Sequence, residues 1–183
     1  MQTRISRACV WISRHLWNRQ HQQVVKHHRA RFSGKIPTIL SCNCTGWVLY
    51  HDLGLQFTSP TINLYMRFPD FLRLLEHLEY YLTLHITPYE GDIKRDYPLG
   101  RLGDLVLYLV HYPSVEEADQ KWQARKKRMD MKNIFVIATD RDGFSSEYLP
   151  RFNALPYRKK IFTHKPVDSP DCVCIPGARG IRK

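Results

Sequence analysis

The sequence has no long apolar run. Nowhere in its 183 residues is there an uninterrupted stretch of the roughly 18–20 apolar residues that a membrane-spanning helix needs. Residues 1–35 also lack the apolar centre of a secretory signal, so we expect no such signal there. With 43% hydrophobic and 25% charged residues, the composition is ordinary for a globular domain and excludes a collagen-like or disordered chain.

Cysteine is scarce. The chain contains five, an odd number: Cys9, Cys42, Cys44, Cys172 and Cys174. The last four form two Cys-x-Cys pairs. This arrangement argues against a secreted disulfide scaffold and predicts a reducing, cytoplasmic setting. A four-thiolate zinc site is disfavoured, because zinc-binding pairs normally have two or more intervening residues. A dinucleotide-binding loop is excluded, since the pattern G-x-G-x-x-G is missing.

Acidic residues are absent from the first 35 positions. This segment holds eight Lys or Arg and four His, whereas residues 36–183 hold 20 basic and 17 acidic residues. Most of the net charge of +11 therefore comes from an N-terminal arm. We divide the chain into a basic arm (1–35), a single α/β domain (36–176) and a basic tail (177–183).

The arm predicts an anionic partner. Ile5, Cys9, Ile12 and Leu16 follow helical spacing, and Arg and His fill the other faces. That pattern is typical of a basic amphipathic helix resting on an anionic membrane surface, which would make the protein peripheral on the inner membrane. The alternative is a solvated helix or one docked on the domain. Nucleic-acid binding is disfavoured, because the domain carries no nucleic-acid-binding motif.

Strand and helix patterns alternate along the domain. Short apolar runs predict buried strands at 38–42, 61–66, 105–111 and 134–138, the third of them central. A period of three to four residues predicts helices at 68–82 and 115–131, and the polar segment 91–102 predicts a loop. Together these patterns indicate an α/β fold, a three-layer sandwich with a mostly parallel sheet flanked by helices. In such sheets ligands bind beyond the carboxyl ends of the strands.

The first candidate site is the turn after the strand at 38–42. Asn43, Cys44 and Thr45 open a helix there, and the N–H groups of a helix start favour an anion. We predict that Asn43 and Thr45 bind substrate or phosphate, and that Cys44 is a nucleophile whose pKa is depressed. The alternative is that Asn43 or Thr45 caps the helix while Cys44 packs beneath it.

Two further candidates flank the apolar run 105–111. Asp104 precedes this run and His111 ends it, and either one is a candidate general base. In the next helix, Arg125 interrupts an apolar stripe. We predict that its guanidinium pairs with a buried carboxylate or binds phosphate.

Two carboxylates follow the strand at 134–138. Asp140 and Asp142 are one residue apart in the sequence T-D-R-D-G, so both can contact one divalent cation. We predict Mg or Mn there, bridging to a diphosphate as in nucleotide-sugar glycosyltransferases with an Asp-x-Asp motif. The same letters are also typical of an ordinary turn.

Three blocks of the sequence resemble the bacterial family known as domain of unknown function 1919. They are ILSCNCTGWVLYHDLGLQFTSPTINLY, YPLGRLGDLVLYLVHYPSVEEADQKWQARKKRM and NIFVIATDRDGFSSEYLPRFNALPYRKKIFTHKP. In that order, they are similar to the family patterns I-S-N-N-C-x-G, W-x-x-R-x-x-R and D-R-D-G. The first block departs from its pattern at Cys42, where the family usually has Asn. The resemblance implies an α/β fold, a bacterial cytosolic setting and a context of exopolysaccharide or capsule biosynthesis, and it assigns no catalytic residue.

These observations support three hypotheses of function. The leading one is a glycosyltransferase-like transferase of surface-polysaccharide assembly that uses a nucleotide-activated or otherwise phosphorylated sugar as donor. The second is a non-catalytic subunit that binds a sugar or another polysaccharide-biosynthesis protein. The third, a nucleic-acid-binding protein, depends on the basic arm and predicts a steep salt dependence.

Overall fold

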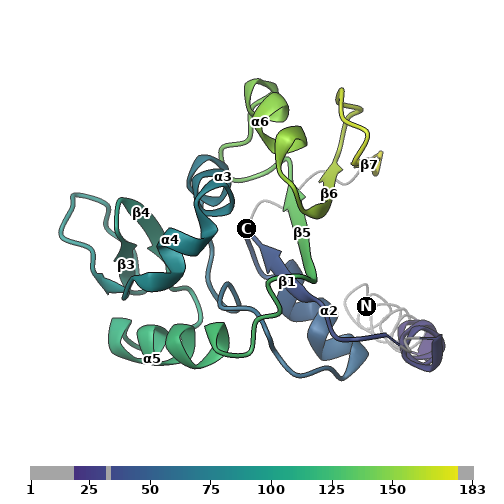
Figure 1. Cartoon of the computed structure of the whole chain (residues 1–183), viewed down its shortest axis with the longest axis horizontal. Helices are drawn as coiled ribbons and strands as arrows, with labels where there is room; N and C mark the ends of the chain where they lie inside the picture. The colour runs from purple at the N-terminus through teal and green to yellow at the C-terminus, as the bar shows by residue number, and fades with distance from the viewer. Residues whose placement is uncertain (1–18, 32–33, 177–183) are drawn as a thin grey trace, which may run out of the picture. The chain divides into compact units, whose positions relative to one another are not determined.

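A computed structural model describes residues 19–31 and 34–176 of the chain (Figure 1). These residues form two compact units. The first contains residues 19–31, 34–35 and Leu49–Gln56, and the second contains Ile36–Val48 and residues 57–176. The amphipathic helix predicted around residues 5–16 lies outside the described residues.

Strands and helices alternate through the described chain. In order they are β1 (Thr38–Ser41), α2 (Thr45–Leu53), α3 (Phe68–Glu76), α4 (Leu78–Thr83), β2 (Thr87–Pro88), β3 (Leu99–Leu102), β4 (Leu105–Tyr108), α5 (Val115–Lys126), β5 (Ile134–Thr139), the 3-10 helix η1 (Ser146–Tyr148), α6 (Leu149–Ala154), β6 (Arg158–Thr163) and β7 (Cys172–Cys174). The predicted α/β class is confirmed.

The main sheet has four parallel strands in the order β1-β5-β6-β7 (Figure 1). Leu40 of β1 pairs in register with Val136 of β5, and Ala138 of β5 pairs with Ile161 of β6. All four side chains are fully buried, which is typical of strands covered on both faces. The predicted mostly parallel sheet flanked by helices is therefore confirmed, and the carboxyl ends of β1 and β5 lie side by side.

The apolar run 105–111 does not join this sheet. Its first four residues form β4, the last strand of a separate antiparallel sheet ordered β2-β3-β4. The expected central strand is therefore wrong, because a continuous apolar run does not distinguish a parallel strand from an antiparallel strand covered on both faces. Part of the expected loop 91–102 is also strand, since Leu99–Leu102 forms β3. The segment 61–66 contributes only an isolated bridge between Tyr65 and Tyr108.

The starts of α3 and α5 follow from local sequence signals. Pro69 stands at the start of α3, and the four residues Phe68, Phe71, Leu72 and Leu75 bury one face of that helix. The predicted single helix 68–82 is divided at His77, whose ψ of 38° is not helical. Ser114 caps α5, since its Oγ accepts a hydrogen bond from the Glu117 amide at 3.2 Å.

One hydrophobic cluster joins the two sheets of the second unit. Its members come from the parallel sheet, the antiparallel sheet and four helices, and include Leu40, Val136, Leu105, Leu107, Phe71, Tyr81, Trp122 and Phe152. This continuous core holds the loops at the strand ends in position.

The first unit has polar contacts of its own. Residues 19–31 are helical and carry four Lys or Arg and no acid. Arg29 donates from Nε to the Asp52 carbonyl at 2.6 Å and from Nη2 to the His51 carbonyl at 3.2 Å, at the end of α2. Gly54, with φ +65°, follows that helix, where a left-handed residue commonly ends a helix. Among the described residues, no helix is long and apolar enough to cross a membrane.

Candidate functional site

A cavity of about 550 Å³ opens at the carboxyl ends of β1 and β5. Its lining comes from the turn after β1, the start of α2, the segment before α3 and the turn after β5: Asn43, Cys44, Thr45, Val48, Tyr65, Thr139, Arg141 and Asp142. Four of the predicted site residues, namely Asn43, Cys44, Thr45 and Asp142, therefore line one cavity. This is the place where an α/β sheet offers a ligand site.

Asn43 organises the turn between β1 and α2. Its Oδ1 accepts hydrogen bonds from the Thr45 amide at 3.1 Å and the Thr45 hydroxyl at 2.7 Å, and its Nδ2 donates to Thr139 Oγ1 at 3.2 Å. The Gly46 amide donates to Ser41 Oγ at 3.1 Å. Two amides at the helix start are thus capped by side chains, so the capping alternative for Asn43 accounts for these contacts.

The side chains of Cys44 and His111 are in contact although the two residues are 67 positions apart in the sequence. The distance from Cys44 Sγ to His111 Nε2 is 3.4 Å, within hydrogen-bonding range for sulfur. Both residues also line a second cavity of about 330 Å³, together with Trp47, Val48 and Asn63. Burial raises the pKa of the Cys44 thiol, contrary to the depressed pKa predicted from its place at a helix start.

The turn after β5 contributes opposite charges. Arg141 and Asp142 both line the 550 Å³ cavity, and Asp142 has a φ of +62°. Asn63, which lines the smaller cavity, has a φ of +66°. No other described non-glycine residue has a positive φ. Asn and Asp tolerate this conformation best, and such residues cluster at functional sites.

Tyr65 is a cavity residue that the sequence patterns did not single out. Its ring contacts Tyr108 with 4.6 Å between centroids. Burial, followed by the charge of Asp142, raises the pKa of Tyr65 to about 12, so the phenol remains a hydrogen-bond donor near neutral pH. Beneath the cavity, burial raises the pKa of the Cys42 thiol to about 12 as well. Cys42 is therefore an inert packing residue.

Asp140 turns away from the cavity that Asp142 lines. Its Oδ2 accepts hydrogen bonds from the His164 amide at 2.7 Å and from His164 Nδ1. Its side chain is only 13% exposed. The two carboxylates of the predicted metal pair thus have different surroundings. In the described part of the chain, no group of three or more His, Cys, Asp or Glu side chains is arranged to hold a metal ion.

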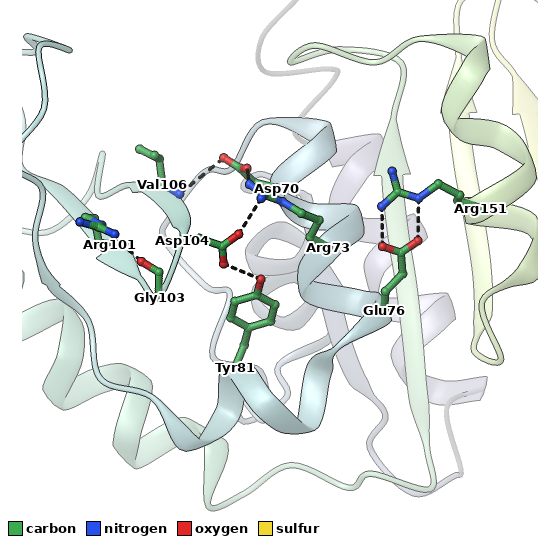
Figure 2. A network of polar contacts seen from close by, with 9 residues as sticks. All are labelled: Asp70, Arg73, Glu76, Tyr81, Arg101, Gly103, Asp104, Val106 and Arg151. Carbon is green, nitrogen blue, oxygen red and sulfur yellow. Dashed lines mark hydrogen bonds and ion pairs between the residues drawn. The ribbon is translucent and has the colours of Figure 1, made fainter.

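Asp104 belongs to a polar network on the antiparallel sheet (Figure 2). It follows Gly103 in the turn between β3 and β4, where Gly103 has a φ of +63°. Its Oδ1 accepts from the Tyr81 hydroxyl at 2.7 Å, and its Oδ2 accepts from Arg73 Nη1 at 2.6 Å. Arg73 also donates to Asp70 at 2.6 Å, so the network ties α3 and α4 to the hairpin. Asp104 lines neither of the two cavities around Cys44.

Arg125 is buried and binds backbone and tyrosine instead of a carboxylate. Its Nη1 donates to the Ile62 carbonyl at 3.1 Å and to the Tyr112 hydroxyl at 2.5 Å, and its guanidinium lies 5.7 Å from the centre of the Phe57 ring. No carboxylate is paired with Arg125 among the described residues. The predicted buried ion pair is therefore wrong, and this side chain anchors the segment 57–62 to α5.

Arg141, which lines the cavity, and His164, the partner of Asp140, were not among the predicted site residues. Arg141 stands between the two aspartates, and His164 directly follows β6. Their positions at strand ends were the available signal. No such signal pointed to Tyr65, since the segment 61–66 was expected to be a strand.

Comparison with known proteins agrees with the resemblance of the three sequence blocks. The chain matches the family described as domain of unknown function (DUF1919) over residues 16–179. It is 44% identical over 130 residues to an uncharacterized protein of Haemophilus influenzae, an alignment that covers 70% of this chain. The match spans 62% of the length of that relative. Because the family match extends over most of the sequence, the chain belongs to the DUF1919 family.

Proposed function

We propose that this protein is a transferase that binds a phosphate-activated sugar in the 550 Å³ cavity and acts in surface-polysaccharide assembly. One observation carries the proposal: a guanidinium, a carboxylate and neutral hydrogen-bonding groups converge on one cavity at the carboxyl ends of two adjacent parallel strands. The polysaccharide context is supported by the resemblance of the sequence blocks. The size of the cavity lies within the roughly 300–1,000 Å³ of small-molecule sites.

The charges of the cavity suit a ligand that is both anionic and rich in hydroxyl groups. Arg141 is exposed, lines the cavity and offers the forked donors that phosphate oxygens prefer. Arg67 is near enough to Tyr65 to oppose the rise in the pKa of that phenol, so a second guanidinium lies close by. Asp142 and the Asn43 amide would hold sugar hydroxyls, and Thr45 and Tyr65 would complete the hydrogen bonding.

The proposal includes a metal ion that is held by one of the two predicted carboxylates. Asp142 lines the cavity and would be the carboxylate that holds a Mg or Mn ion, which would neutralise the charge of a diphosphate, whereas Asp140 is engaged with His164. We therefore expect Asp142→Asn to abolish any metal dependence of ligand binding and Asp140→Asn to leave it nearly unchanged. Titration calorimetry with and without Mg or Mn compares the two variants. Equal losses in both would restore the two-carboxylate site.

A non-catalytic binding subunit is the second candidate function. It is favoured by the contacts of two predicted site residues whose charges serve intramolecular contacts: Asp104 (Figure 2) and Arg125. In that case the cavity would bind a sugar or a polysaccharide-biosynthesis protein without turning it over. Product analysis after incubation with a nucleotide sugar and a lipid-linked acceptor separates the two functions.

Attachment to an anionic membrane surface through residues 1–35 is a further part of the proposal. Its support in the described residues is the helix 19–31, with four cationic side chains and no acid. Vesicles of phosphatidylglycerol should retain the full chain at low salt and release it at high salt, because surface charge attraction is screened. Retention of a variant lacking residues 1–35 would contradict membrane attachment through these residues. It would not affect the proposal that the cavity binds a sugar.

Ligand-induced thermal stabilisation tests the central claim. Nucleotide sugars, nucleoside diphosphates and sugar phosphates are each added to the full chain. A ligand at 100 times its dissociation constant stabilises the folded state by about 2.7 kcal/mol, or roughly 5–10 °C in Tm for a chain of this size. Arg141→Ala should remove the shift. Arg95→Ala is the matched control, because Arg95 is exposed and donates only to its neighbour's carbonyl, that of Lys94.

The outcomes are distinct. A shift that Arg141→Ala removes and Arg95→Ala preserves supports the assigned cavity. A shift that both variants preserve would place the ligand elsewhere. If no phosphate-bearing sugar or nucleotide shifts Tm, the proposed ligand class is wrong.

A further inference from the structure

Cys44 lines two cavities that differ in the charged side chains beside it. One is the 550 Å³ cavity, which has Asn43, Arg141 and Asp142 in its lining. The other, of about 330 Å³, has the apolar side chains of Trp47 and Val48 in its lining, together with His111. Cys44 and Val48 are the residues that both linings share. A reactive atom on a shared wall can exchange a group between occupants of the two cavities.

The thiol also has a base within reach. His111 Nε2 lies 3.4 Å from Cys44 Sγ, the distance at which an imidazole accepts a thiol proton. His111 is exposed, so its ring can exchange protons with solvent or with a bound molecule. No carboxylate is paired with this imidazole among the residues that the structure describes, which makes the arrangement a dyad.

We propose that Cys44 and His111 are the nucleophile and the base of an acyl transfer, in which an ester or thioester donor acylates Cys44 and a sugar hydroxyl then accepts the acyl group. The apolar side chains of the smaller cavity suit the acyl chain. The larger cavity, with Arg141 and Asp142 in its lining, suits a hydroxyl-bearing acceptor. The inference rests on the proposed function only for the identity of that acceptor.

The two half-reactions balance without any oxidant or cofactor. In the first, His111 takes the thiol proton, the sulfur attacks the donor carbonyl carbon, and the proton passes to the departing alcohol or thiol. In the second, His111 takes a proton from the acceptor hydroxyl, whose oxygen attacks the thioester carbonyl. The sulfur leaves and recovers the proton, so Cys44 returns to its initial state.

A comparison of Cys44 with two other described cysteines, Cys42 and Cys172, supports this assignment. Burial raises the pKa of Cys44, so the resting thiol stays protonated and its attack depends on the base beside it. Cys42 lies beneath, fully buried, with no comparable access. Cys172 faces the Thr163 hydroxyl at 3.2 Å, and no imidazole is within hydrogen-bonding distance of it. Only Cys44 among these combines partial exposure, a base and a cavity.

Acylation of the full chain by p-nitrophenyl acetate tests the inference. We expect a burst of p-nitrophenol of about one equivalent, and mass spectrometry should place one acetyl group on Cys44. His111→Gln should slow the burst on the order of 10²–10⁴-fold, since it removes the base. Cys44→Ala should abolish it, and Cys172→Ser, the matched control, should keep it.

The second half-reaction uses the acetylated protein and a nucleotide sugar or sugar phosphate. The acceptor should speed loss of the acetyl group from Cys44 and carry it on a hydroxyl. An acetyl group found on lysine or on Cys172, or a burst unchanged in His111→Gln, would overturn the inference. His111→Gln changes an exposed residue, so this test holds even if Cys44→Ala fails to fold.

Failure of the inference and failure of the proposed function give different results. If the sugar ligand shifts Tm but no acetyl group reaches Cys44, the acyl transfer is wrong and the binding site stands. If Cys44 is acetylated with the expected His111 dependence and no sugar accelerates its loss, the thiol chemistry stands and the sugar ligand is wrong.

Discussion

The cavity at the ends of β1 and β5 and the polar network beside the β3–β4 hairpin contain the same kinds of side chain. In the network, Asp104 accepts from both Arg73 and Tyr81, and the carboxylate is satisfied within the fold (Figure 2). In the cavity, Arg141, Asp142 and Tyr65 face a space large enough for a ligand. An Asp or Arg near a strand end is therefore informative about function only once its partner is known.

The largest expected change in stability comes from the removal of the Arg125 side chain. The side chain is 7% exposed and donates to the Ile62 carbonyl and the Tyr112 hydroxyl. Arg125→Ala removes both of these hydrogen bonds, leaves the Tyr112 hydroxyl with its bond to the Ile62 carbonyl alone, and opens a void, so we expect a loss of about 2–5 kcal/mol in the free energy of unfolding. Urea denaturation measures it.

Arg141→Ala provides the comparison for that measurement. This exposed residue should change the unfolding free energy by no more than about 0.5 kcal/mol. If the two arginine variants were equally destabilised, the distinction between an anchoring and a ligand-facing arginine would fail.

Gly46→Ala tests the close packing of the turn that shapes the cavity. A Cβ at this position would lie 2.6 Å from Ser41 Oγ, the atom that caps the Gly46 amide. We expect a loss of about 1–3 kcal/mol in unfolding free energy and weaker binding of any cavity ligand, because the turn has to shift. Chemical denaturation and the thermal-shift assay measure the two effects.

Gly34→Ala is the matched control for that substitution. Nothing lies within 4 Å of a Cβ built at Gly34, and its φ is not in the left-handed region. The unfolding free energy of the Gly34→Ala variant should stay within about 0.5 kcal/mol of the parent value. A neutral Gly46→Ala would show that the Ser41 contact does not constrain the turn.

The smallest expected effect concerns the pH dependence of the network. The Tyr81 hydroxyl, together with the Arg73 guanidinium, holds the pKa of the exposed Asp104 carboxyl below its usual value. A lowered pKa in the folded state adds stability above the unfolded-state value near pH 4, and that stability is lost as the pH falls through the folded value.

A double-mutant cycle with Tyr81→Phe and Asp104→Asn measures this interaction. Because Asp104 is exposed, we expect a coupling of at most about 1 kcal/mol at pH 7. The coupling should fade below about pH 4 as the carboxylate becomes protonated. A coupling that persisted at pH 2 would mean that the hydrogen bond does not require the ionised carboxylate.

Local sequence patterns predicted the elements around the site well. The strands β1 and β5 and the start of α2 follow from buried apolar runs and capping residues, which act over a few neighbouring positions. The apolar run 105–111 was misassigned, because burial on both faces is shared by parallel and antiparallel strands. The break at His77 within the predicted helix 68–82 had no signal in the apolar period.

The candidate site was predicted only in part, and the reason is geometric. Asn43, Cys44, Thr45 and Asp142 were found because the carboxyl ends of parallel strands are ligand sites. Asp140 and Asp142 are one residue apart, yet one faces His164 and the other lines the cavity. Side-chain direction in a turn depends on backbone angles such as the positive φ of Asp142, which residue type alone does not determine.

The sequence by itself determined the α/β class and the family, and it predicted a candidate site at the carboxyl ends of the strands. These follow from patterns that are local or repeated along the chain. The tertiary structure decided which polar groups are free to bind a ligand. It brought His111 to Cys44 across 67 residues, and it committed Arg125 to Ile62 across 63 residues. Such long-range pairs depend on how the elements pack, since each residue type has several possible partners and packing selects one.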